Sequence, residues 1–526
     1  MKRRQFVQMG AVAGVAAGVL NSAVAAGTDS ILDAGVRVQA ARMQAGTLSA
    51  QSLARQYLAR IARLDQAGPH VNAIIELNPD ALALAAVLDA ERKAGKVRGP
   101  LHGIPVLLKD NIATHDKMST SAGSLALAGV RAREDAHIVK QLRAAGAVIL
   151  GKTNLSEWAN MRSTHSISGW SGRGGLTRNP HALDRNTSGS SSGSAAAMAA
   201  GFATLAVGTE TDGSIVSPAS ICGIVGFKPT LGLLSRSGII PIAASQDTAG
   251  PMTRTVEDAA VMLTAMAGVD STDAATAASA GKSVDFASAL RLDALRGKRL
   301  GVARNFFGAN DAVDAIAEQA LAVLQAQGAI LIDVTLPNID KYGDTETEVL
   351  LVEFTPGLAD YLARYAPDAP IRNMDELIFF NSKHAARELQ YFGQEHLLAS
   401  AKKGGLASPD YVQAQRENRQ YAREEGIDKV LKEFSLDALV APTGGPAWLT
   451  DFINGDHYGS SFSSPAAVAG YPHVTVPAGF IHDLPVGMSF VGTAWSDAAM
   501  LGLAYAYEQA SQARRAPRFL PTVNPR

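Results

Sequence analysis

The chain has a single cysteine, few aromatic residues and no surplus of charge of either sign. Cys222 stands alone among 526 residues, so the chain can form no intrachain disulfide and no multi-cysteine metal or iron–sulfur site. Cys222 lies in an apolar run, which predicts a buried, unreactive thiol. Lys and Arg number 48 against 49 Asp and Glu. Because these charges nearly cancel, the protein has no net electrostatic field that would favour nucleic acid or an anionic membrane as a partner.

Motifs for metal and nucleotide sites are also missing. The sequence has no H-E-x-x-H pattern, and its histidines are scattered. Residues 189–194 (GSSSGS) could open a helix and bind an anion there, but they lack the Gly-Lys-Ser/Thr ending that makes a phosphate loop specific. We therefore predict neither a metal nor a cofactor. Four histidines are better interpreted as surface or single hydrogen-bonding residues than as metal ligands: His102, His115, His137 and His165.

The one long apolar run lies at the N-terminus. Basic residues 2–4 precede the small, apolar stretch 7–20, and residues 23–25 (AVA) form an A-x-A cleavage site. We predict a signal peptide over residues 1–26 and a periplasmic or secreted mature protein. The segment 3–7 (RRQFV) resembles a twin-arginine export signal, and an ordinary secretory peptide stays open. No other stretch is long and apolar enough to span a bilayer, so we expect no stable membrane anchor.

Strand and helix patterns alternate along the rest of the chain. This alternation predicts an α/β protein with a largely parallel or mixed sheet. Strands on both sides of a helical excursion at about 340–430 favour one large domain over residues 27–526. Residues 274–285 are expected to form an exposed loop. The periodicity predicts helices at 36–64, 81–94, 136–145, 194–201, 256–267, 312–327 and 498–513, and strands at 104–109, 147–150, 204–207, 299–303, 329–334, 437–442, 474–480 and 485–491.

The stretch from Gly189 to Thr230 is rich in Ser and Gly, yet apolar runs are threaded through it. Residues 189–193 formally match G-x-S-x-G, the nucleophile elbow of α/β-hydrolases, which would make Ser191 the nucleophile. That motif needs a buried strand directly before it. The residues that precede Gly189 are polar instead, so the elbow interpretation is rejected.

A second interpretation combines Lys109 with two serines. The apolar run 104–108 could bury Lys109, lower its pKa and make it a neutral base. Ser214 follows a strand in a tight turn whose N–H groups could bind an oxyanion, and Ser190 could relay a proton between them. Taken singly, these features are more often a snorkelling lysine, a helix cap and a hairpin turn. The residues alone leave the choice open.

The motifs together resemble the amidase signature family. Its serine loops appear here as GSSSGS at 189–194 and GTETDGS at 208–214, followed by Pro218–Ala219 and by GFKPT at 226–230. Its lysine motif appears as GIPVLLKD at 103–110, and the serines Ser190 and Ser214 are 24 positions apart, as in the family. The similarity runs from roughly residue 38 to residue 509.

This resemblance implies a central mixed, twisted sheet covered by helices on both faces, and a Ser–cis-Ser–Lys triad. Ser214 would be the nucleophile that carries the acyl group, Ser190 the bridging serine after a cis peptide bond, and Lys109 the base. No metal or cofactor is needed. The remaining site residues would form the oxyanion hole or hydrogen-bond beside it: Thr211, Asp212, Gly213 and Ser191.

Some positions depart from the commonest family pattern. Glu210, Asp212 and Val216 replace the usual Asp, Gly and Arg, a variant shared with bacterial peptide amidases, which release ammonia from the C-terminal carboxamide of a peptide. Asp212 could hydrogen-bond locally and set the turn, and the sequence leaves the direction of its side chain open. The resemblance thus implies a small-molecule or short peptide amide as substrate. An acylamidase for aryl or fatty amides, a component of a tRNA-dependent amidotransferase and an inactive binding protein remain alternatives, and no oligomeric state is predicted.

Overall fold

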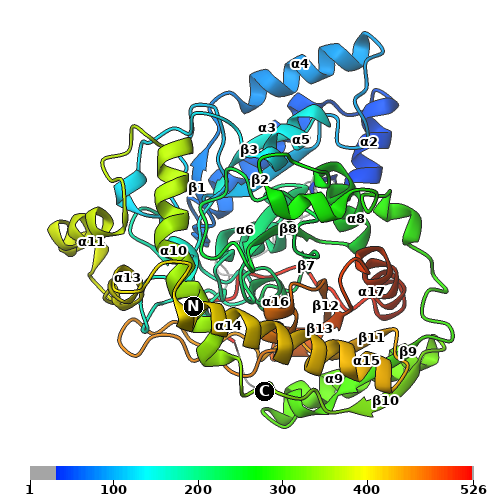
Figure 1. Cartoon of the computed structure of the whole chain (residues 1–526). Coiled ribbons are helices and arrows are strands. Elements are labelled where there is room, and N and C mark those ends of the chain that lie inside the picture. Colours follow the sequence, from blue (N-terminus) through cyan, green and yellow to red (C-terminus); the bar gives the residue numbers. More distant parts are fainter. Residues whose placement is uncertain (1–30, 524–526) are drawn as a thin grey trace, which may run out of the picture.

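The computed structural model describes residues 31–523 (Figure 1). The predicted signal peptide, 1–26, lies outside the described residues. Within the described range, no helix is both long and apolar enough to cross a membrane. The described chain folds as one large α/β domain around a large mixed sheet, as predicted, and β4 (Trp170–Ser171) and β5 (Gly175–Leu176) form a small second sheet.

Eleven strands form the large sheet. Strands β3, β2 and β6 are parallel neighbours, the strands from β6 through β8, β7, β12 and β13 to β11 are antiparallel, and β11, β9 and β10 are parallel again. In spatial order the strands are β1 (Ile74–Leu77), β3 (Val148–Thr153), β2 (Pro105–Lys109), β6 (Leu205–Glu210), β8 (Thr248–Thr253), β7 (Val225–Lys228), β12 (His473–Ile481), β13 (Leu484–Val491), β11 (Ala438–Pro442), β9 (Arg299–Ala303) and β10 (Ile330–Val334).

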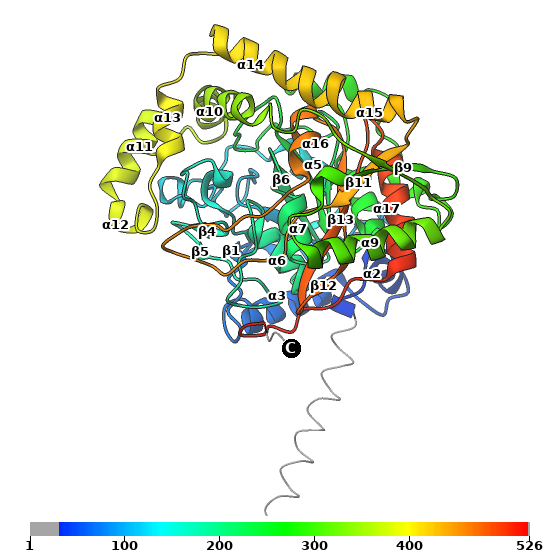
Figure 2. The same cartoon turned by 90° about the horizontal axis from the view of Figure 1, so that it is seen from below.

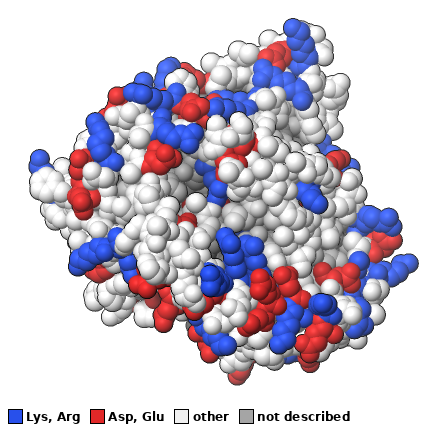
Figure 3. Space-filling view, viewed as in Figure 1, with Lys and Arg blue, Asp and Glu red and all other residues white. Residues whose placement is uncertain are grey.

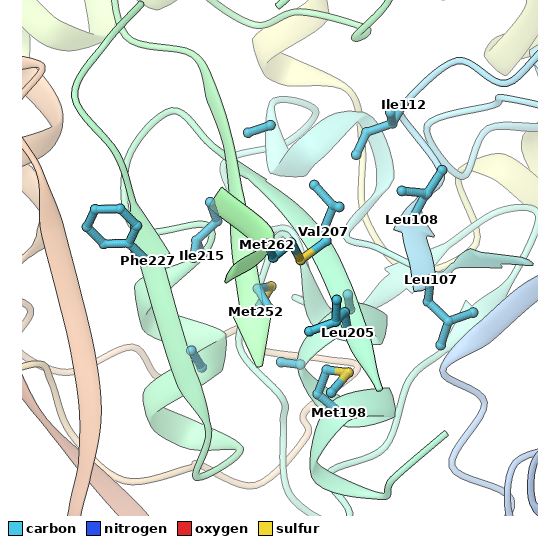
Figure 4. Close-up of a cluster of buried hydrophobic side chains, with 14 of the residues drawn as sticks. Leu107, Leu108, Ile112, Met198, Leu205, Val207, Ile215, Phe227, Met252 and Met262 are labelled. Carbon is cyan, nitrogen blue, oxygen red and sulfur yellow. The ribbon is translucent and has the colours of Figure 1, made fainter. Parts of the chain in front are cut away.

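The middle of the sheet is buried on both faces. Every residue of β2, β3 and β6 is buried, which explains why these strands have continuous apolar runs instead of an alternating pattern. Figure 4 shows side chains from β2, β6 and β8 packed together, among them Leu107, Leu205 and Met252. Lys109 ends one of these buried strands, so the fold places an ionisable side chain at the edge of the core.

Helices pack against both faces of the sheet. Helix α6 contacts β2, β3 and β6, and α7 contacts β7, β12 and β13. Helix α8 contacts β7 and β8, α17 contacts β12 and β13, and α8 and α17 contact each other. The helices outside the excursion are α2 (Val36–Gln44), α3 (Ala50–Leu64), α4 (Ala81–Lys93), α5 (His137–Ala144), α6 (Ser192–Ala199), α7 (Val216–Ile221), α8 (Val256–Met266), α9 (Asp311–Ala326), α16 (Ser463–Ala469) and α17 (Asp497–Ser511).

The segment from about 340 to 430 is helical, as expected. Figure 2 shows α10, α13 and α14 along one side of the sheet, with α2 and α3 on the opposite side. Its elements are α10 (Gly343–Tyr365), α11 (Met374–Lys383), α12 (Ala385–Glu388), α13 (Glu395–Ala401), α14 (Pro409–Arg419), a π-helical stretch (Gln420–Ile427) and α15 (Asp428–Glu433).

The surface in the view of Figure 1 carries both signs of charge. Figure 3 shows Lys and Arg side chains interspersed with Asp and Glu over this face, with no field of a single sign. This distribution agrees with the near-zero net charge of the sequence, −1 at pH 7. The face offers no basic surface that would suit a polyanion.

Two sequence-based predictions need correction. The single helix at 36–64 is two helices, because Gly46 has φ +71 and the Ser49 side chain caps α3 by accepting from the Ser52 N–H. The segment 274–285 is not simply an exposed loop, since it begins with a 3-10 turn in which Thr276 and Ser279 are buried. Strands β1, β7 and β8 were not predicted at all.

Candidate active site

Lys109 is the last residue of β2, and its amine nitrogen lies among oxygen atoms. Its side chain is fully buried. Nζ lies 2.7 Å from Ser190 Oγ, 2.8 Å from Thr209 Oγ1 and 3.2 Å from the Thr209 carbonyl oxygen. The Asn111 amide donates to the same Thr209 hydroxyl at 2.9 Å. Strand β6 pairs with β2 in parallel, which brings Thr209 alongside Lys109.

The loop before α6 holds Ser190 against this lysine. The Gly189–Ser190 peptide bond is cis. A Cβ on Gly189 would lie 2.1 Å from Ser156 Oγ, so this close packing requires glycine. Ser191 Oγ donates to the Thr209 carbonyl at 3.1 Å and accepts from the Thr209 N–H at 3.2 Å. The hydroxyl that the elbow motif would make a nucleophile is therefore engaged with β6.

A tight turn between β6 and α7 carries Ser214. Gly213 has φ +73, a left-handed conformation that favours glycine. The Glu210 carboxylate accepts from the N–H groups of Ile215 and Val216, at 2.7 and 3.0 Å, and so fixes the start of α7. Glu210 therefore sets the turn, and the sequence left open whether Asp212 has this local role.

The two serine loops meet directly. The Ser191 N–H donates to the Ser214 carbonyl at 3.1 Å. Within the described part of the chain, the N–H groups of Asp212, Gly213 and Ser214 donate to no other group. Unpaired N–H groups beside a hydroxyl can stabilise the negative oxygen of a tetrahedral intermediate.

The burial of Lys109 changes the pKa of its amine. Desolvation lowers the pKa of Lys109 from 10.5 to about 7, and the negative charges of Asp247 and Glu210 oppose that change. A lysine with this pKa is neutral in a large fraction of molecules near neutral pH. It can then accept a proton, which an exposed lysine cannot do efficiently.

The serines open onto a cavity of about 580 Å³. Ser190, Ser214 and the turn from Thr211 line one wall, and the other walls come from distant segments, including Leu350 of α10 and His396 of α13. Apolar side chains such as Ile242 also contribute. Much of the lining is polar and uncharged or acidic, including Ser163, Ser166, Ser168, Asn454, Asp456 and Tyr458.

Asp212 points away from its own turn. Its Oδ2 accepts from Ser464 Oγ of α16 at 2.6 Å, and its carboxyl group is hydrogen-bonded to that of Glu346 in α10. Asp212 thus joins the serine turn to two helices that follow it by more than a hundred residues.

The structure brings together all the residues predicted for the site: Lys109, Ser190, Ser191, Thr211, Asp212, Gly213 and Ser214. Reasoning from the sequence missed Thr209 and Asn111, which lie in and beside the quoted motifs, and Asp247, whose charge acts on Lys109. Of the four scattered histidines, His165 lines the cavity, as does His396, which the sequence did not single out. Within residues 31–523, no group of His, Cys, Asp or Glu could hold a metal ion. Cys222 is buried, and burial raises the pKa of its thiol.

Comparisons with known proteins identify the class. The family model described as Amidase matches residues 53–501. The chain therefore belongs to the amidase family and is an amide-hydrolysing enzyme. The predicted amidase signature family is confirmed.

The structure is similar to solved bacterial peptide amidases. The native peptide amidase from Stenotrophomonas maltophilia is 52% identical, with a TM-score of 0.88, over 92% of this chain and 98% of that one. A probable amidase of Arabidopsis thaliana is 39% identical over 87% of this chain and 86% of its own length. A putative amidase of Schizosaccharomyces pombe is 36% identical over 87% of this chain and 82% of its own length.

Proposed function

We propose that the enzyme hydrolyses the C-terminal carboxamide of peptides through Ser214, Ser190 and Lys109. The observation that carries the mechanism is the 2.7 Å contact between Lys109 Nζ and Ser190 Oγ, in a serine that lines the same cavity as Ser214. A neutral amine has two N–H groups and one lone pair. The two Thr209 oxygens can accept the N–H groups, which leaves the lone pair for the Ser190 hydroxyl.

In the first half of the reaction, Ser214 Oγ attacks the amide carbon. Its proton passes to Ser190 Oγ, while the Ser190 proton passes to neutral Lys109. The free N–H groups of Asp212, Gly213 and Ser214 hold the oxyanion. The C–N bond then breaks, the proton returns through Ser190 to the departing nitrogen, and ammonia leaves an ester on Ser214.

In the second half, water attacks the ester carbonyl. The same relay takes one proton from the water and returns it to Ser214 Oγ as the C–O bond breaks. The products of the whole cycle are ammonia and a peptide with a free carboxylate. Substrate and one water supply every atom, so the cycle needs no further reactant.

The cavity supports a peptide substrate over a fatty or simple aryl amide. Hydroxyl, amide and carboxylate groups along its walls can pair with the N–H and C=O groups of a short peptide. Asp456, for example, already accepts from the Ser168 N–H at 3.0 Å and from Trp448 Nε1 at 3.2 Å, and so shapes the polar wall. The likeness to peptide amidases, at 52% identity, points the same way.

A substrate panel tests this specificity. Ammonia release is measured from amidated di- and tripeptides, free amino acid amides, aryl amides and fatty amides, with the isolated chain and no added protein. We expect kcat/KM to be at least about tenfold higher for the amidated peptides. A preference for aryl or fatty amides would support the acylamidase alternative, and activity only with added partner proteins and charged tRNA would support the amidotransferase alternative.

We also propose that the protein is exported. The basic residues 2–4, the apolar stretch 7–20 and the A-x-A site at 23–25 support this. Fractionation of a Gram-negative bacterium that makes the full chain should recover the shortened protein in the periplasm. Replacing Arg3 and Arg4 by Lys should block twin-arginine export, whereas unaffected export would indicate the general secretory route.

A further inference from the structure

The carboxyl groups of Asp212 and Glu346 meet behind the serine turn. Asp212 precedes Gly213 and Ser214, whereas Glu346 lies in the first turn of α10 and is buried. Each also accepts from a separate donor: Ser464 Oγ donates to Asp212 Oδ2 at 2.6 Å, and Gln246 Nε2 donates to Glu346 Oε1 at 2.7 Å. The Ser463 side chain, also of α16, hydrogen-bonds to the Asp212 carboxyl group as well.

Two ionised carboxylates cannot hydrogen-bond to each other, because both are only acceptors. The contact between Asp212 and Glu346 therefore requires one proton between them. Burial raises the pKa of both groups, and the charge of Asp212 raises that of Glu346 further. Glu346 is accordingly the protonated partner, and its O–H donates to Asp212.

This pair connects to the oxyanion turn at two points. Asp212 is itself part of the turn, and Gln246, which donates to Glu346, also donates to the Thr211 carbonyl at 3.3 Å. Helix α10 is thereby joined to the Thr211 carbonyl through Gln246 and to the Asp212 side chain directly. A change in the charge of the pair would act directly on the N–H groups beside Ser214.

We propose that Asp212 and Glu346 share one proton that positions the oxyanion turn, so that the enzyme is active with the pair singly protonated and loses activity when that proton leaves. Glu346 acts through Asp212 and is a positioning residue. The inference rests on the Ser214 mechanism proposed above. In this account the acid side of the pH profile belongs to Lys109 and the alkaline side belongs to the pair.

The surroundings of the pair disfavour a second negative charge. Lys228 of β7 is the cation that faces Asp212, while Glu210 of β6 adds a negative charge beside it. Burial raises the pKa of the Tyr342 phenol, and the charges of Asp212 and Glu346 raise it further. Burial also raises the pKa of Tyr458, where the charge of Asp212 adds to the increase and hydrogen bonds to Ser217 and Ser461 oppose it. Asp340, before α10, adds a further negative charge near Tyr342. Loss of the shared proton would place two adjacent charges in this buried site, and the pair would separate.

The test compares Glu346→Gln with Glu346→Leu. Glutamine copies the protonated acid: its carbonyl can accept from Gln246, its amide can donate to Asp212, and it does not titrate. Leucine fills similar space but makes neither bond. The kcat and KM for an amidated peptide are measured from pH ~5 to pH ~10.5, with thermal unfolding of each variant as a folding control.

We expect the wild type to lose activity on the alkaline side and Glu346→Gln to keep its activity there. Glu346→Leu should lower kcat at least about tenfold, with KM changed less than about threefold, because the turn affects the oxyanion more than substrate binding. The proposal is overturned if Glu346→Gln keeps the wild-type alkaline fall, if it loses as much kcat as Glu346→Leu, or if the wild-type profile stays flat to pH ~10.5.

These outcomes are distinguishable from failure of the triad. An active Lys109→Ala variant would contradict the mechanism in which the pair acts. A wild-type enzyme with the predicted acid limb but an unchanged alkaline limb in Glu346→Gln would contradict only the pair.

Discussion

Two lysines on neighbouring strands, Lys109 of β2 and Lys152 of β3, are both completely buried. Desolvation lowers both pKa values from 10.5, to about 7 for Lys109 and about 8 for Lys152. Their partners differ. Lys152 donates to the Ile112 carbonyl at 2.6 Å and to Thr120 Oγ1 at 2.8 Å, and neither Ile112 nor Thr120 lines the cavity that contains Ser214.

Burial and a lowered pKa therefore do not identify a catalytic lysine in this protein. The distinguishing feature of Lys109 is a hydroxyl partner, Ser190, that opens onto the cavity. Lys152 instead has the buried carboxylate of Asp110 near it. The charges of Asp110, Asp116 and Glu76 oppose the lowering of the Lys152 pKa by burial. We infer that Lys109 takes part in the reaction and that Lys152 stabilises the loop after β2.

The largest expected difference is in activity. Lys109→Met should lower kcat for an amidated peptide by at least about 10³-fold, because the relay loses its base. The matched variant Lys152→Met should stay within about threefold of the wild type per folded molecule. Ammonia release, normalised to folded protein by circular dichroism, measures both, and equal losses would break the distinction between the two lysines.

The second difference is in pH dependence. Activity needs neutral Lys109, so kcat/KM should fall about tenfold per pH unit below about pH 7, close to the lysine pKa. Lys152→Met should leave this acid limb in place, since Lys152 takes no part in proton transfer. Loss of the acid limb in Lys152→Met would show that Lys152, and not Lys109, is the group that titrates.

The third difference is in stability. Lys152→Met should lower the free energy of unfolding by roughly 1–3 kcal/mol, because Asp110 and Thr120 stay buried and lose a partner. Lys109→Met should lower the free energy of unfolding least at low pH. The folded-state pKa of Lys109 is about 7, below the ordinary 10.5, so between these values the unfolded chain binds more protons and wild-type stability from this group rises with pH. Urea unfolding at pH ~6 and ~9 checks both expectations, and a stable Lys152→Met contradicts the first.

The smallest effect concerns the carboxylates that face each lysine. The charge of Asp247 raises the pKa of Lys109, so Asp247→Asn should move the acid limb to lower pH by up to about one unit. Asp116→Asn is the matched control, because Asp116 faces Lys152, and it should not move the limb. A shift in the opposite direction for Asp247→Asn would be inconsistent with the assignment.

Much of the fold was predictable because its strands are long or strongly apolar. Strand 104–109, the hairpin of β12 and β13 and the helical segment at 340–430 all have clear periodicity. Strands β7 and β8 were missed because Gly226, Gly250 and Pro251 weaken any strand pattern, and their pairing across the sheet is a tertiary effect. The break between α2 and α3 depends on one glycine and one capping serine within a continuous apolar pattern.

The site residues that lie within the sequence motifs were predictable. The resemblance implied Lys109, Ser190 and Ser214, and the structure places all three together, with both serines on one cavity. Glu346 and Ser464 could not be predicted, because they lie 134 and 252 positions from Asp212 in the sequence and no local pattern links them. The direction of Asp212 also depends on those distant helices, which is why the sequence left it open, and the structure shows Glu210 in the local role.

The most direct test of the central claim follows the nucleophile itself. A fluorophosphonate forms an O–P bond with a serine whose proton a base removes, and fluoride leaves. Peptide mass spectrometry should locate the adduct on Ser214, with Lys152→Met labelled within about threefold of the wild-type rate and Lys109→Met at least about 100-fold more slowly. Labelling of Lys109→Met at the wild-type rate, or an adduct on Ser191 in place of Ser214, would contradict the account.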